Sequence, residues 1–178
     1  DTVVQQITFN QNLKTNWDSP AGRTTGIDVK AYLASDSADF LGLVDLPVIN
    51  DSLVDPAKAV VDWWEQADNA GLRGTFYQMW YPVPGFPGSP NWTLWKALIT
   101  FLRAHHDRVL YDVRAALGGP EVLLAPVADV LVAIYDAIEA EELDADFTDF
   151  WYDSLHINEL GYYVAALTHW AVMHQQSP

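Results

Sequence analysis

Short apolar runs alternate along the chain with longer stretches in which apolar residues recur at helical spacing. The short runs predict strands, and the longer stretches predict amphipathic helices. Strands are expected over residues 2–9, 40–49, 75–80 and 122–125. Helices are expected over residues 28–34, 56–68, 92–117, 126–138 and 160–171. Because strands and helices alternate, we expect a doubly wound α/β domain over residues 1–178, with a parallel sheet and helices on both faces.

A loop rich in Pro, Gly and aromatic residues follows the third predicted strand, over residues 81–90. Some of its aromatic side chains must belong to the core, but Phe86 stands between Gly and Pro and has little core to fill. Exposed aromatic rings bind apolar groups and stack on sugars. We therefore expect this loop to form a wall of a substrate site, through Trp80, Tyr81, Phe86 and Trp92.

An acid and a histidine stand three residues apart just before the last predicted helix. Asp153 and His156 share one turn, so the carboxylate can reach the imidazole, fix its tautomer and stabilise the imidazolium. A base held by an acid is half of a hydrolytic triad. In the structural alternative, Asp153 caps the final helix and His156 is a polar residue of its first turn.

Composition and charge limit the class of partner. A chain of 178 residues with 50% hydrophobic content supports a full core. The net charge of −15 disfavours nucleic acid and anionic membranes, because like charges repel. The absence of cysteine excludes disulfides, a thiol nucleophile and thiolate metal ligands, and it leaves the compartment open. No apolar run is long enough to span a bilayer.

Two polar clusters could suggest a metal ion. His105, His106 and Asp107 are adjacent in a predicted helix, where consecutive residues point to different faces. The acidic stretch over residues 139–149 lacks the glycine-punctuated loop of a calcium site. We therefore interpret the first as a solvated, partly packed helix surface and the second as a solvated connector, and we expect neither a metal nor another cofactor.

Polar side chains also follow the first two predicted strands. Asn12 lies in the loop after the first strand, and Asn50 and Asp51 end the second. In open α/β sheets, sites form at the carboxyl ends of the strands. Asparagine amides can donate to a developing oxyanion without titrating, although Asn50-Asp51 is also typical of an ordinary Asx-turn.

Together these features resemble the SGNH (GDSL-like) hydrolases, a family of serine esterases. Asp153-x-x-His156, followed by Gly161, looks like the last sequence block of that family. The resemblance implies His156 as the general base and Asp153 as its orienting acid. Val48-Ile49-Asn50-Asp51 is similar to the G-x-N-D block, with Val48 in place of Gly, and implies Asn50 as an oxyanion donor. Where the family has a donor Gly after its first strand, this chain has Asn10-Gln11-Asn12.

The nucleophile is the largest departure from the family. The family's Ser lies in a G-D-S block after the first strand, and counting strands back from His156 places that strand before Asp1. Within the chain, Ser52 is a possible substitute and Ser35-Asp36-Ser37 a weaker one. With Ser52 as nucleophile, too few strands would separate it from His156. We therefore expect an incomplete sheet, whose missing strand is supplied by an N-terminal fragment or a second chain.

Two functional classes follow from this reading. The first is a serine esterase that cleaves a small-molecule ester or an acylated carbohydrate. The second is a non-catalytic module on the same scaffold that binds a carbohydrate or an apolar ligand through the aromatic loop.

Overall fold

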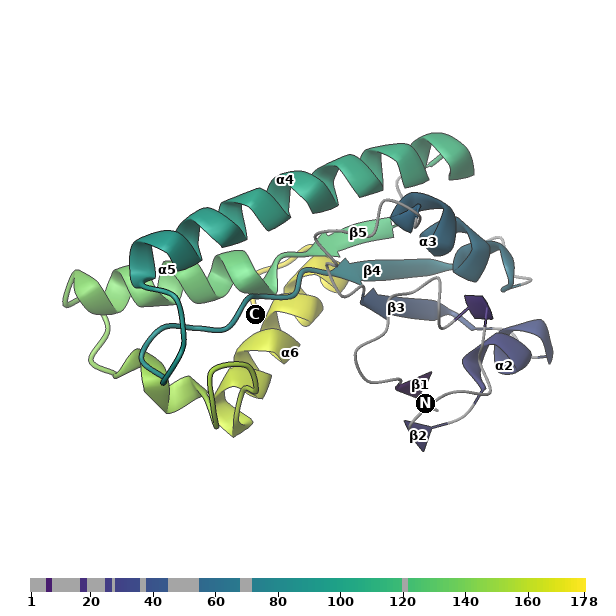
Figure 1. The fold of residues 1–178 in the computed structure, drawn as a ribbon. Coiled ribbons are helices and arrows are strands. Elements are labelled where there is room, and N and C mark those ends of the chain that lie inside the picture. Colours follow the sequence, from purple (N-terminus) through teal and green to yellow (C-terminus); the bar gives the residue numbers. More distant parts are fainter. Residues whose placement is uncertain are drawn as a thin grey trace. The chain divides into compact units, whose positions relative to one another are not determined.

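Figure 1 shows the computed structural model of the chain. Its described residues form two compact units, the first within residues 1–76 and 108–123 and the second within residues 77–107 and 124–178. Strand β4 (Arg73–Tyr77), helix α4 (Trp92–Leu117) and strand β5 (Val122–Ala125) contribute residues to both units. The structure describes residues 6–7, 17–18, 25–26, 28–35, 38–44, 55–67, 72–119 and 122–178.

The main sheet is parallel and has three strands, in the order β3 (Phe40–Val44), β4 and β5 (Figure 1). Gly74 permits the close approach of β4 to β3, because a Cβ atom at this position would lie 2.0 Å from the carbonyl oxygen of Leu41. Each pair of neighbouring strands is connected through a helix. The predicted α/β class is therefore confirmed, whereas the single domain over residues 1–178 stays a prediction.

Two shorter strands form a separate sheet. β1 (Gln6–Ile7) pairs antiparallel with β2 (Thr25–Gly26). The prediction that residues 2–9 form a strand of the parallel sheet is therefore wrong for the part that is described. Nothing in the apolar pattern of the sequence indicated β2, because this strand consists of one Thr and one Gly. β3 is the edge strand of the sheet as far as the described residues go, and the predicted missing strand stays a prediction.

The helices of the first unit begin at side-chain caps. Asp28 Oδ1 accepts a hydrogen bond of 2.9 Å from the amide of Ala31 at the start of α2 (Val29–Ser35). Asp55 Oδ1 accepts one of 3.0 Å from Lys58 N at the start of α3 (Pro56–Glu65). Pro56 is the first residue of this helix, where an N–H would have no partner within the helix, so the N–H that proline lacks is not missed. The apolar face of α3 is buried through Ala59, Val60, Trp63 and Trp64.

The second unit is built on α4, α5 (Val127–Glu139), the 3-10 helix η2 (Phe147–Phe150) and α6 (Glu159–His174). The segments α5, η2 and α6 contact one another. Aromatic rings supply much of the core, as in the stack of Trp92 on Tyr135, whose centroids lie 4.0 Å apart. None of the helices in the described ranges combines the length and apolar character that a membrane span requires.

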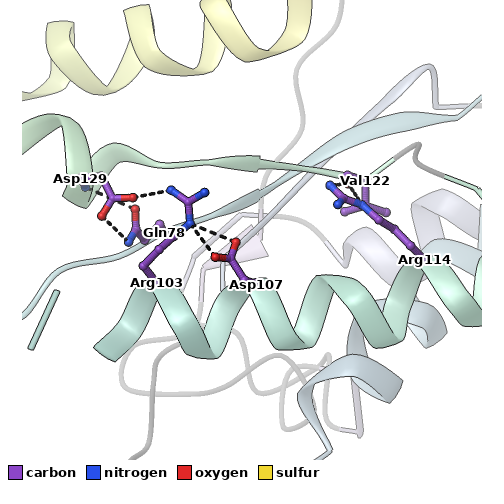
Figure 2. A network of polar contacts seen from close by, with 6 residues as sticks. All are labelled: Gln78, Arg103, Asp107, Arg114, Val122 and Asp129. Atoms are coloured by element: carbon purple, nitrogen blue, oxygen red, sulfur yellow. Dashed lines mark hydrogen bonds and ion pairs between the residues drawn. The ribbon is translucent and has the colours of Figure 1, made fainter. Parts of the chain in front are cut away.

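A network of polar side chains connects the end of β4 with α4 and α5 by hydrogen bonds within the second unit (Figure 2). The buried Gln78 amide donates from Nε2 to Asp129 Oδ1 at 3.2 Å and accepts from the Asp129 N–H at 3.3 Å. Arg103 donates to the other oxygen of Asp129 at 2.6 Å and also to Asp107. These contacts satisfy the polar groups of Gln78, so we interpret the network as structural. In the first unit, Arg114 donates to the carbonyl oxygen of Val122.

Candidate active site

The Asp153/His156 turn belongs to the second unit and is closed by backbone hydrogen bonds. Trp151 and Ile157 form an isolated antiparallel bridge, and Tyr152 N donates to the His156 carbonyl oxygen at 2.8 Å. Trp151 and Ile157 are buried in the core. The five residues between these two anchors therefore form a loop with fixed ends.

Asp153 and His156 are hydrogen-bonded, as their spacing predicts. His156 Nδ1 lies 2.8 Å from Asp153 Oδ2 and 3.0 Å from Oδ1. The His156 side chain is 69% exposed and the Asp153 side chain is 56% exposed, so the pair is open to solvent. With Nδ1–H donating to the carboxylate, the neutral imidazole presents Nε2 as the proton acceptor. The arrangement is suited to general base chemistry.

The Asp153 carboxylate has further hydrogen bonds that hold the turn. Its Oδ1 atom accepts from the backbone amides of Leu155 and His156, both at 2.8 Å. The hydrogen bond from His156 and these two amides lower the pKa of Asp153 to about 2. Asp153 is therefore ionised above pH 4, and an acidic limb in a pH–rate profile above that value would not report on this carboxyl group.

The helix after the turn has its own cap. Asn158, and not Asp153, is the N-cap of α6, since its Oδ1 accepts from Leu160 N at 2.9 Å and Gly161 N at 3.3 Å. The structural alternative for Asp153, a cap on the final helix, is therefore wrong. Close packing leaves no room for a side chain at Gly161, because a Cβ atom there would lie 2.5 Å from Ile157 Cβ and 2.6 Å from the Phe150 carbonyl oxygen.

The aromatic loop contacts the turn through its backbone, and Trp80, just before the loop, contacts the turn through its side chain. Trp80 is only 8% exposed, and its indole Nε1 donates to the Leu155 carbonyl oxygen at 2.9 Å. The ring is enclosed in the core, and the place of Trp80 in a substrate wall stays a prediction. No sequence pattern indicated this contact, since 75 residues separate the partners.

The other three aromatic candidates are partly buried against the same core. One face of the Trp92 ring stacks on Tyr135. The hydroxyl oxygen of Tyr81 is buried, and this burial raises the pKa of Tyr81. Phe86 precedes a turn in which Ser89 N donates to the Phe86 carbonyl oxygen. Substrate contacts by Tyr81, Phe86 and Trp92 stay predictions.

The candidates for nucleophile and oxyanion donor lie in other parts of the chain. Asn12, Asn50 and Ser52 are outside the described residues. Ser35 ends α2, but its side chain and the following Asp36-Ser37 are also outside the description. Of the predicted catalytic residues, the structure therefore places Asp153 and His156 together.

The polar clusters that could suggest a metal have other roles. Within the described ranges, no group of three or more His, Asp or Glu side chains could hold a metal ion. His106 is buried, and burial lowers its pKa to about 4, so it packs as a neutral ring. In the acidic stretch, Asp146 and Asp149 form a capping box that starts η2.

Comparisons with known proteins support the scaffold. A solved structure from Slackia heliotrinireducens, described as a "putative SGNH hydrolase", matches with a TM-score of 0.53 and 22% sequence identity. The match covers 92% of this chain and 80% of that one. No protein-family model and no curated protein sequence matches the chain. The likeness shows that this chain has an SGNH-hydrolase-like fold.

Proposed function

We propose that the chain is the base-bearing part of a serine esterase of the SGNH type. The observation that carries this proposal is the exposed, hydrogen-bonded Asp153/His156 pair, on a scaffold similar to an SGNH hydrolase. A structural role alone would not require the imidazole to stand in solvent with its second nitrogen available.

In the proposed reaction, His156 Nε2 takes the proton of a serine hydroxyl while the serine oxygen attacks the ester carbonyl carbon. Asp153 holds the imidazole and stabilises its charged form. The imidazolium then protonates the leaving alcohol as the ester bond breaks, and water hydrolyses the acyl-enzyme by the same route. Asn50 is the proposed oxyanion donor.

The nucleophile is proposed to be a serine encoded upstream of Asp1, with Ser52 as the substitute within the chain. The order of the described strands is compatible with a Ser-bearing strand that precedes β3 in the sequence, because β3, β4 and β5 are neighbours in sequence order. A preceding segment or a second chain would add the Ser-bearing strand.

We propose a neutral ester or an acylated carbohydrate as the substrate. After Arg114 the sequence contains no Lys or Arg, while acidic residues continue to Glu159, so the chain around His156 is strongly negative. Such a field repels anionic substrates. Exposed apolar side chains beside the base, among them Tyr152 and Leu155, suit an apolar acyl group.

The alternative of a non-catalytic binding module has less support. It depends on free aromatic ring faces, yet Trp80 is buried and Trp92 stacks on Tyr135.

An esterase assay on two forms of the protein tests the proposal. The complete translated product of the gene is expected to hydrolyse p-nitrophenyl acetate, and residues 1–178 alone are expected to show little or no turnover. The anionic p-nitrophenyl hemisuccinate should be hydrolysed more slowly than p-nitrophenyl acetate. The difference between the two rates should become smaller at high salt, because salt screens the negative charge of the protein. Inactivity of both forms would contradict the proposed function. Robust turnover by residues 1–178 that disappears in Ser52→Ala would make Ser52 the nucleophile.

A further inference from the structure

The carbonyl oxygens of the two residues between Asp153 and His156 accept hydrogen bonds from the aromatic loop and from Trp80, just before it. Ser154 O accepts a hydrogen bond of 2.7 Å from Val83 N, and Leu155 O accepts one of 2.9 Å from Trp80 Nε1. The two donors are buried, whereas the turn that they hold is largely exposed.

With these bonds, two consecutive peptide groups of the turn are each hydrogen-bonded at both the carbonyl oxygen and the N–H. In the Leu155–His156 peptide, Trp80 binds the carbonyl oxygen and Asp153 binds the N–H. In the Ser154–Leu155 peptide, Val83 binds the carbonyl oxygen and Asp153 binds the N–H. Because a peptide group is planar, hydrogen bonds to its carbonyl oxygen and its N–H together restrict rotation of the plane, and with it the direction of the His156 Cα–Cβ bond.

Of the two donors to the carbonyl oxygens, Trp80 is the one that acts through its side chain, and the core fixes its ring. Trp151 lies edge-on to it with the ring centroids 5.4 Å apart, and Tyr77 lies edge-on at 6.0 Å. Trp151 also forms the bridge that closes the turn. The indole N–H is therefore held at a constant place relative to the base of the loop that carries His156.

We propose that Trp80 is a positioning residue that orients His156 by hydrogen-bonding the carbonyl group of the preceding residue. Its importance for catalysis rests on the proposed esterase function, but its effect on the turn does not. Without the indole N–H, the Leu155–His156 peptide is held from one end, and the imidazole spends less time in line with Asp153.

Trp80→Phe tests this proposal, because it removes the N–H and keeps an aromatic ring in the core. Trp95→Phe is the matched control, since the buried Trp95 donates from Nε1 to the Tyr81 carbonyl oxygen at 3.1 Å, outside the turn. In residues 1–178, NMR measures the hydrogen exchange of the Leu155 and His156 amides and the share of the Nδ1–H tautomer of His156. We expect Trp80→Phe to accelerate exchange at least about 10-fold and to lower that share, and Trp95→Phe to change neither.

Equal effects of the two variants, or a folded Trp80→Phe protein with unchanged exchange and tautomer, would overturn the proposal. If Trp80→Phe does not fold, the indole N–H of wild-type Trp80 provides the test. Strong protection of this N–H from exchange supports the proposal, and exchange as fast as in an exposed indole overturns it. In an active complete gene product, Trp80→Phe should lower kcat with little change in KM. An inactive gene product with the expected NMR changes would refute the esterase and leave the positioning role in place.

Discussion

Replacing His156 with Gln in the complete gene product is expected to lower kcat for p-nitrophenyl acetate by about 10³- to 10⁴-fold. Gln retains a polar side chain but cannot take the proton from a serine hydroxyl at neutral pH. The fold should be unaffected, because the His156 side chain is 69% exposed and hydrogen-bonds to the exposed Asp153. The measurements are initial rates, together with circular dichroism and the midpoint of thermal unfolding.

His174→Gln is the matched control for this prediction. His174 is exposed in the last turn of α6, and its replacement makes the same chemical change away from the Asp153/His156 turn. We expect activity within about two-fold of wild type. A His156→Gln protein that keeps its activity would remove His156 from the reaction.

Gly161→Ala is expected to lower the free energy of unfolding by about 3 kcal/mol. The added methyl group would lie 2.6 Å from the Phe150 carbonyl oxygen, a backbone atom that cannot move aside alone. The better helix propensity of Ala offsets up to about 1 kcal/mol of the strain. Urea unfolding of residues 1–178 measures the effect.

Gly42→Ala provides the comparison. A Cβ atom at Gly42 would meet only Thr75 Oγ1 at 3.9 Å, which is ordinary van der Waals contact. Its cost should stay within about 0.5 kcal/mol. Equal stability of the Gly161→Ala and Gly42→Ala proteins would show that Gly161 is not required by its contacts with Ile157 and Phe150.

Local signals in the sequence predicted most helices to within a few residues. Asp55-Pro56 marked the start of α3, and the apolar period of α4 ended at Leu117 before a glycine pair. Such signals act between residues close in the chain. β1 was assigned to the wrong sheet because strand pairing depends on distant partners, and η2 was missed because a short 3-10 helix has too few residues to show a period.

The same contrast holds for the candidate site. The Asp153–His156 hydrogen bond was predictable, because three residues of a turn bring the two side chains together. The contact of Trp80 with Leu155 was not, because it depends on how a loop after β4 meets a turn before α6. A tryptophan at the end of a predicted strand is equally compatible with a core ring and with a substrate wall.

The most direct test of the central claim, that the Asp153/His156 pair activates a serine, is covalent labelling of the complete gene product with a fluorophosphonate. The probe reacts with a serine only where a base activates the hydroxyl group. We predict one labelled serine, mapped by mass spectrometry upstream of Asp1 or at Ser52, with labelling that is lost in His156→Gln and kept in His174→Gln. The absence of labelling, or labelling that persists at full rate in His156→Gln, would contradict the account.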